Sequence, residues 1–233
     1  MQQEYSTQLQ MMQEQLAALA KAYLNKVYGW MALSMLVTAG SAIFAMQSDQ
    51  ILTWSQNNQL WLLLGTFGII LIMAFCRASL TAGALSVLFI TFSALEGLAL
   101  GPILCMYTTQ SLGLTFACTA GMFGAMALYG AVTKRNLSGM GRTLMMLLFG
   151  LIIAGIANIF FGSSTADLVI SGIGVVVFAL FTAYDTQRLL AEGAYLVDTD
   201  ARSKGAIMGA VQLYLDFLNL FLYLLRFLGA ARD

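Results

Sequence analysis

Three acidic side chains stand inside long apolar segments, where a charged group needs a specific reason to be. Asp216 interrupts LYLDFLNLFLYLL, Asp185 lies in FTAYDTQRL, and Glu96 lies in LEGLALGP. An ionised carboxylate inside a membrane is costly, so such residues normally face a bundle interior, a partner or water. The chemistry open to them is proton exchange or the binding of a hard cation.

A polar stripe runs along the segment that contains Asp216. Gln212, Asp216, Asn219 and Tyr223 follow one another at steps of four, three and four, which puts them on one face of a helix. Pointing this face at lipid would be costly. We therefore expect the last helix to lie at the centre of a bundle.

Asp185 has two interpretations that the residues leave open. It lies near a helix end with Arg188 one turn later, so it either pairs with Arg188 at the water interface or faces Asp216. Two carboxylates in one site cannot both ionise at low cost, so the pair would titrate as a unit. At about 1.5 Å per residue, Asp216 lies about 10–15 Å inside the boundary and Asp185 only about 5 Å, so pairing requires a tilt or a shifted helix start.

Arg77 and Glu96 are the remaining charged candidates. Arg77 ends the second apolar stretch, where it either reaches lipid headgroups or closes over the carboxylates as a counter-ion. Glu96 is expected to line the same cavity as the aspartates, as are the other polar residues of the stripe.

The composition identifies the elements that must position these residues. The 233 residues are 60% hydrophobic and 9% charged, with a mean hydropathy of +0.81, which is typical of an integral membrane protein. A spanning helix needs about 20 mostly apolar residues. The chain offers seven such stretches, at 27–46, 60–76, 80–107, 112–132, 143–162, 166–187 and 206–228. Because these runs are continuous and do not alternate, they predict an all-α membrane protein with seven transmembrane helices.

The basic residues predict the orientation. Nine of them fall on one side of the predicted spans: Lys21, Lys26, Arg77, Lys134, Arg135, Arg142, Arg188, Arg202 and Lys204. Only Arg226 and Arg232 fall on the other side. This bias predicts a cytoplasmic N-terminus and an outer C-terminus.

Three parts follow from these boundaries: a cytoplasmic tail (1–26), the seven-helix domain (27–228) and a short C-terminal tail (229–233). In the first tail, apolar residues recur at steps of four and three: Tyr5, Leu9, Met12, Leu16, Leu19 and Tyr23. An amphipathic helix on the cytoplasmic membrane face and a frayed polar tail both stay open.

Several functions are disfavoured by what the sequence lacks. It has no basic run, which argues against nucleic-acid partners. It has no histidine, so any pH sensing must come from carboxylates. Without a Cys/His or Ser/His pair or a phosphate-binding loop, we expect neither an enzyme nor a cofactor. Cys76, Cys105 and Cys118 are expected to be small buried hydrophobic residues, with a disulfide between the last two as the alternative.

Three stretches resemble a known family. AGMFGAMALYGAVTKRNLSGMG (120–141), VFALFTAYDTQRL (177–189) and LYLDFLNLFLYLLR (213–226) are similar to the signature regions of the Bax inhibitor-1 family, in particular its bacterial inner-membrane branch. The resemblance implies a seven-helix bundle with the last helix central, in the inner membrane. It also implies a pH-sensitive calcium leak in which Asp185 and Asp216 are the pH sensor, and in which Arg77 belongs to the closed state. Carboxylate oxygens are ligands that calcium prefers, so the two aspartates are also candidate calcium ligands that protons would compete for.

Other functions are less favoured than the leak. The serious alternative is a non-catalytic regulator that restrains a membrane-anchored, ATP-dependent protease, as the resemblance implies for some bacterial relatives. An intramembrane aspartyl protease would need a second aspartate in a GxGD loop, and here it lies in LYLD. A proton-coupled transporter ranks third because no inverted repeat is visible.

Overall fold

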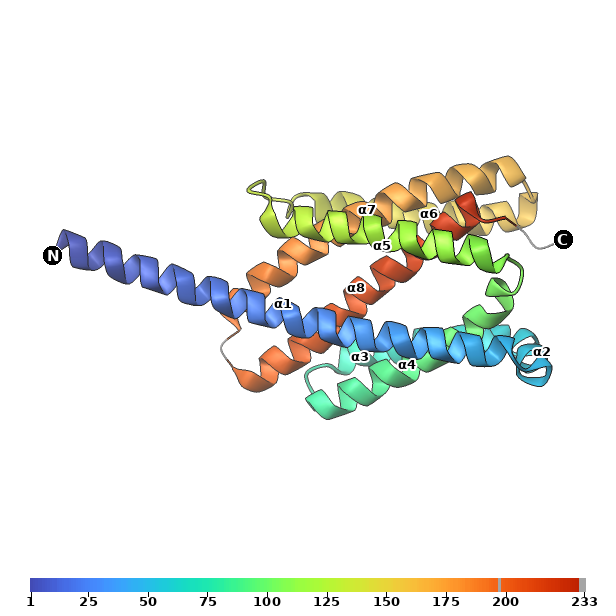
Figure 1. Cartoon of the computed structure of the whole chain (residues 1–233), viewed down its shortest axis with the longest axis horizontal. Coiled ribbons are helices and arrows are strands. Elements are labelled where there is room, and N and C mark those ends of the chain that lie inside the picture. The colour runs from blue at the N-terminus through green and yellow to red at the C-terminus, as the bar shows by residue number, and fades with distance from the viewer. Residues whose placement is uncertain (197, 231–233) are drawn as a thin grey trace.

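Eight α-helices make up the computed structural model of the chain, which describes residues 1–196 and 198–230 (Figure 1). They are α1 (Gln2–Met46), α2 (Asp49–Asn57), α3 (Gln59–Cys76), α4 (Ala82–Leu104), α5 (Thr109–Val132), α6 (Met140–Phe161), α7 (Ser164–Tyr195) and α8 (Thr199–Leu228). All except α2 are long and apolar enough to cross a membrane, seven spans in total. The prediction of an all-α membrane protein with seven transmembrane helices is confirmed.

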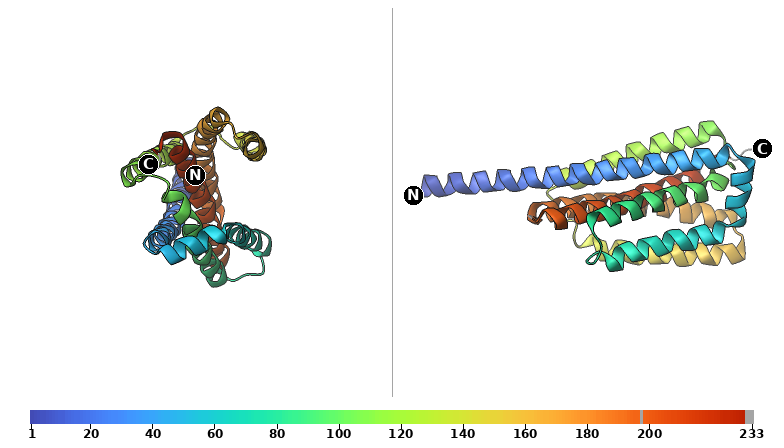
Figure 2. Two further views of the ribbon diagram at one scale, coloured as in Figure 1. Left: turned by 90° about the vertical axis from the view of Figure 1, so that its right-hand side faces the viewer. Right: turned by 90° about the horizontal axis from the view of Figure 1, so that it is seen from below.

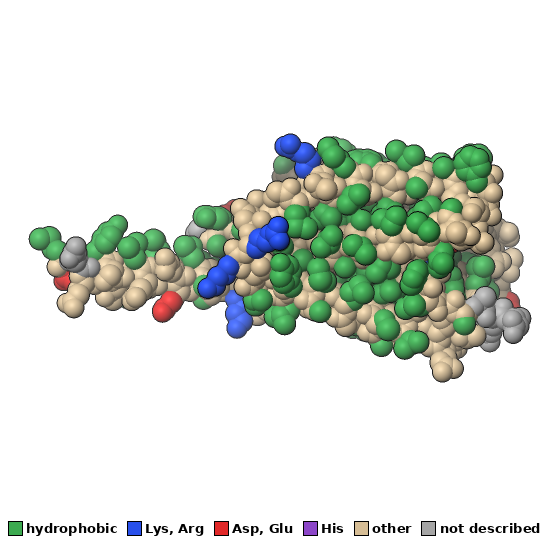
Figure 3. Space-filling model, turned by 90° about the horizontal axis from the view of Figure 1, so that it is seen from above, with side chains coloured by type: hydrophobic (Ala, Val, Ile, Leu, Met, Phe, Trp, Pro, Cys, Tyr) green, Lys and Arg blue, Asp and Glu red, His purple; other side chains and the backbone are tan. Residues whose placement is uncertain are grey.

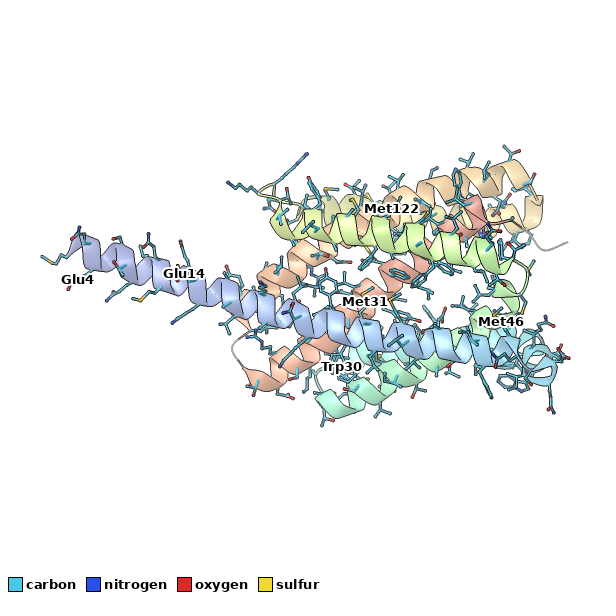
Figure 4. All side chains as sticks on the ribbon, viewed as in Figure 1. Glu4, Glu14, Trp30, Met31, Met46 and Met122 are labelled. Atoms are coloured by element: carbon cyan, nitrogen blue, oxygen red, sulfur yellow. The ribbon has the colours of Figure 1, made fainter. Side chains whose placement is uncertain are left out.

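The first helix is much longer than a membrane span. α1 is one continuous helix of 45 residues, and its first part projects well beyond the rest of the bundle (Figures 1 and 2). In Figure 4, Glu4 and Glu14 mark this projecting part, Trp30 and Met31 lie alongside the bundle, and Met46 lies at its far end. The predicted tail is therefore helical from residue 2 and continuous with the first span.

A short helix, α2, lies in the connection between the first two spans. α2 begins after Ser48, whose hydroxyl accepts a hydrogen bond from the Ile51 backbone N–H at 3.5 Å. The same type of cap starts α4 at Thr81, α5 at Thr108 and α7 at Ser163. Such caps satisfy N–H groups that have no partner within the helix.

The packing of α8 positions the candidate residues. α8 contacts α1, α4, α5 and α7, and α6 packs against α7. A larger share of the apolar window of α8 is buried than in any other of the seven spans. Its location at the centre of the bundle stays a prediction.

Small residues allow the closest helix contacts. A Cβ atom added at Gly97 of α4 would lie 2.7 Å from the Ser41 Cβ of α1, and one added at Gly101 would lie 2.8 Å from the Ala45 Cβ. The Gly97 and Gly101 pair thus gives the small-residue contact typical of membrane helices.

The outer surface of the bundle is apolar, and the cysteines belong to it. Figure 3 shows hydrophobic side chains spread over the bundle, and Lys and Arg gathered at the end from which α1 projects, which we call the basic end. Cys76 and Cys118 are exposed and Cys105 is half-buried, and all three are free thiols. The expectation of buried cysteines is wrong because in a membrane protein an apolar context also describes the lipid-facing surface, and the alternative disulfide is not formed.

The C-terminal end of α8, which lies away from the basic end, is bonded to neighbouring helices. The Ala230 backbone N–H donates to the Ser111 hydroxyl at 2.9 Å, and the Thr108 N–H donates to the Ala230 carbonyl at 3.3 Å. Arg226 forms an ion pair with Asp167 at 3.3 Å. Arg232 and most of the predicted C-terminal tail lie outside the described residues.

Candidate functional site

Asp185 of α7 and Asp216 of α8 face each other inside the bundle. Their carboxyl groups lie within hydrogen-bonding range, and only 7% of Asp185 and 5% of Asp216 is exposed. The Oδ2 atom of Asp216 has no hydrogen-bond partner among the described residues. Two carboxyls can share a hydrogen bond only when one of them is protonated. One proton between the two carboxyls would thus give Oδ2 the partner that it lacks among the described residues.

The pairing with Asp216 resolves the open question about Asp185. Arg188 is exposed, and it forms no salt bridge with Asp185 among the described residues, although its positive charge lies close enough to act on that carboxyl. The two aspartates face each other although the predicted spans put them at different depths, and α7 continues to Tyr195, about two turns beyond its predicted end. Asp185 consequently lies well inside its helix.

Two members of the polar stripe of α8, Asp216 and Tyr223, face α7. Seven residues beyond Asp216, the Tyr223 ring stacks on Phe178, with 5.7 Å between ring centroids and 25° between planes. Phe178 itself lies seven residues before Asp185, as expected for antiparallel helices in register. A Cβ added at Gly174 would lie 2.6 Å from the Tyr223 ring, so this glycine makes room for it.

Gln212 and Asn219, the other members of the stripe, are half-buried. The Asn219 amide donates to the Leu215 carbonyl of its own helix at 2.7 Å.

Arg77 does not lie over the two aspartates. Its Nη2 atom is 3.7 Å from Oε1 of Glu192, and the two side chains are 45% and 29% exposed. Glu192 is on α7, seven residues after Asp185, or about 10 Å nearer the basic end. The structure therefore brings Arg77 to the same helix as Asp185, but to a different carboxylate.

Glu96 belongs to a separate polar cluster on the other side of α8. It lies beside the Thr66 hydroxyl and close to Tyr214. The Tyr214 hydroxyl is 2.7 Å from that of Thr38, which also lies 3.0 Å from the Ser93 carbonyl. Tyr214 is two residues before Asp216, so the two side chains leave α8 in nearly opposite directions. The structure does not bring Glu96 to the aspartate pair.

Resident metal ligands are sparse near the pair. Within residues 1–196 and 198–230, no three His, Cys, Asp or Glu side chains are grouped so that they could hold a metal ion. Calcium prefers six to eight oxygen ligands. Asp185 and Asp216 alone supply four carboxylate oxygens, fewer than this number.

Two contacts near the pair were missed by the sequence analysis. Glu192 shares a helix face with Asp185 at a spacing of seven, a signal that could have identified it as the partner of Arg77. Tyr28 of α1, whose hydroxyl lies 3.4 Å from that of Thr186, carried no such signal because its partner is 158 residues away.

Comparison with known proteins places the chain among bacterial membrane proteins. A family model described as inhibitor of apoptosis-promoting Bax1 matches residues 20–233. An inner membrane protein of Escherichia coli K12, YbhL, is 41% identical over 217 residues, which cover 91% of this chain and 93% of that protein. Uncharacterized proteins of Borreliella burgdorferi and Deinococcus radiodurans are 38% and 35% identical, over 91% and 97% of this chain and 93% and 97% of their own lengths.

Proposed function

This chain belongs to the Bax inhibitor-1 family and is a multi-pass membrane protein similar to a bacterial inner-membrane protein, and on that premise we propose that it is a pH-sensitive calcium leak channel gated by Asp185 and Asp216. The matched family is one of membrane proteins and is not a known enzyme family. The proposed activity is non-catalytic, with calcium as the permeant ion and protons as the regulator.

The main support for this proposal is that two buried carboxyls on antiparallel helices face each other. A buried polar group without a partner is costly, so Asp216 Oδ2 needs a reason to be retained. A proton shared between the two carboxyls, or a cation held by both of them, would supply the missing partner. Buried ionisable groups inside a membrane bundle typically mark ion or proton pathways.

The protonation state of the pair changes the contact between α7 and α8. With one proton present, the two carboxyls share a hydrogen bond and hold the helices together. With none, two negative charges repel each other at close range, and the pair becomes an attractive contact for a divalent cation. We propose that the packed arrangement around Tyr223 and Phe178 is the closed one, and that separation of the two helices opens the path.

The ion pair between Arg77 and Glu192 supports the same closed arrangement from the basic end. It joins α3 to α7 on the helix that carries Asp185. The role of Arg77 as a counter-ion of the aspartates is proposed for a different arrangement, since it requires Arg77 to move about two turns along α7.

Calcium flux through the purified protein tests the leak. Liposomes that hold a calcium dye would be prepared with and without the protein, and dye fluorescence would be followed after calcium is added outside at several pH values around neutrality. We expect a calcium influx that requires the protein and changes with pH. Flux equal to that of empty liposomes at every pH would contradict the proposal.

A second candidate function is the restraint of a membrane-anchored, ATP-dependent protease. The projecting part of α1 favours it, because Tyr5, Leu9 and Met12 are exposed and available to another protein. Deletion of residues 1–20 separates the two functions. A leak should survive this deletion, whereas a tail-mediated restraint, measured as the lifetime of a protease substrate in cells, should be lost.

A further inference from the structure

The projecting part of α1 carries a continuous apolar seam. We call Tyr5, Leu9, Met12, Leu16 and Leu19 the N-terminal seam. Their exposed fractions include 66% for Tyr5, 52% for Met12 and 38% for Leu9, and Leu16 is half-buried. Exposed apolar side chains in a row on a water-facing helix indicate a surface that binds something.

The spacing of the seam is that of a coiled coil. Its steps alternate strictly between four and three residues, an average of 3.5 that keeps the apolar side chains on one line along a helix. Leu9 and Leu16 occupy one heptad position, and Tyr5, Met12 and Leu19 occupy the other. A knobs-into-holes partner for this seam is therefore another helix with the same repeat.

The charge distribution favours an identical helix as that partner. The positions that flank the seam are uncharged: Ser6, Gln8, Gln13 and Gln15. The charged residues Glu4, Glu14 and Lys21 take the outer heptad positions. In Figure 3 hydrophobic side chains follow one edge of the projecting helix and acidic ones the opposite edge. Because flanking charges decide which coiled-coil helices repel each other, two copies would meet without repulsion.

The direction of the helix argues against burial of the seam in lipid. α1 is uninterrupted, and no glycine or proline precedes Gly29, so the helix has no sequence-encoded bend between the seam and the span. The seam therefore continues along the axis of the spanning helix and projects beyond the end of the bundle (Figure 2). Copies that share one membrane orientation present this segment parallel to one another.

We infer that the N-terminal seam binds the same seam of a second copy, forming a short parallel coiled coil that makes the protein a homodimer. The seam spans only about two heptads, and a coiled coil of that length is weak when free in water. Confinement of both copies to one membrane raises their effective concentration and offsets this weakness. Dimerisation goes beyond the proposed leak and does not depend on it.

Cysteine cross-linking in liposomes tests the dimer. Cys76, Cys105 and Cys118 are first replaced by Ser in the full-length chain. Met12→Cys then puts a thiol in the seam, and Glu14→Cys puts one on the outer face two residues away as the matched control. Both side chains are exposed, so neither change disturbs the bundle. Mild oxidation should give several-fold more disulfide-linked dimer with Met12→Cys, and adding Leu9→Glu with Leu16→Glu should remove the excess.

Three results would overturn the inference. Equal cross-linking at positions 12 and 14 would indicate random collision. A Met12→Cys protein that stays monomeric, and whose thiol reacts freely with a water-soluble maleimide, would indicate a seam that is open to another protein. A Met12→Cys protein that stays monomeric, and whose thiol is protected from this reagent and lies close to brominated lipid, would indicate a helix that lies on the membrane.

Discussion

Asp185 and Asp216 can do chemistry as a pair that neither carboxyl could do alone. Each is buried, and the Oδ2 atom of Asp216 has no protein partner in the described chain. A single buried carboxyl would simply hold its proton, whereas two within hydrogen-bonding range can exchange one proton for a divalent cation. This exchange is the simplest way in which the proposed leak could respond to pH.

Calcium should therefore shift the pH response. If protons and calcium compete for the pair, a higher calcium concentration removes protons more readily, so the midpoint of the pH response moves to lower pH. Flux measured over a pH series at low and high calcium checks this, with potassium at equal ionic strength as the control for screening. A midpoint that does not move with calcium would mean that the ion does not contact the pair.

The ion pair between Arg77 and Glu192 should act on flux as one unit. Arg77→Gln and Glu192→Gln each remove it, so each should raise flux under closing conditions by a similar factor, and the double variant should add little. Because the pair is partly exposed, we expect a coupling of about 1 kcal/mol or less. Fully additive effects in the flux assay would show that the two residues act independently.

Residue-level prediction from the sequence had a clear limit. The polar stripe can be assigned to one helix face because its spacing is local, and two of its members, Asp216 and Tyr223, meet α7 in the structure. Glu96 was grouped with the aspartates only because it is also an acid within an apolar segment, and it lies on the other side of α8. Which side of a helix meets which neighbour depends on tertiary packing, and no local pattern records that.

At the scale of elements, Gly130 lets α5 pack closely against α7. A Cβ added at Gly130 would run into the backbone carbonyl of Ala183, two residues before Asp185. A backbone atom in a spanning helix cannot move aside at low cost. Any change at Gly130 should therefore separate the helices next to the aspartate pair.

Gly130→Ala should destabilise the protein by about 1–3 kcal/mol, as overpacking typically does. Gly124→Ala is the matched control, because it lies on the same helix and its added Cβ meets nothing within 4 Å. The thermal unfolding temperature in detergent measures both variants. Equal unfolding temperatures would mean that α5 and α7 can separate without cost, which the packing argues against.

Helix ends were the least predictable part of the elements. The apolar runs predicted all seven spans, and α3 and α5 end at Cys76 and Val132 as expected. α7 was predicted to end at 187 because QRLLAEGAY mixes polar and apolar residues, but a helix can leave the membrane without ending. The segment DQILTWSQN forms α2 although it also mixes polar and apolar residues, and a search for long apolar runs does not detect such a helix.

At the scale of the whole molecule, the chain has two different ends. The basic end carries the projecting part of α1 and the pair of Arg77 with Glu192, and the opposite end carries α2 and the contacts of Arg226 and Ala230. The excess of Lys and Arg at the first end predicts that it is cytoplasmic. The C-terminus should then lie on the outer side.

Reporter fusions test this orientation. A fluorescent protein fused before Met1 should fluoresce, because it folds in the cytoplasm, and alkaline phosphatase fused after the last residue should be active, because it needs the oxidising outer compartment. The reciprocal fusions serve as controls. An inactive phosphatase at the C-terminus together with a fluorescent protein that is bright there would reverse the assignment of that end.

The measurement that tests the central claim most directly is the pH dependence of calcium flux in Asp185→Asn, Asp216→Asn and Glu96→Gln. Asparagine keeps the shape of aspartate and cannot titrate, so each Asn variant should conduct at a rate that no longer changes with pH around neutrality. Glu96→Gln replaces a half-buried carboxyl on the other side of α8 with an amide and should keep the wild-type profile. An unchanged pH response in both Asn variants, or its loss in Glu96→Gln alone, would contradict the aspartate gate.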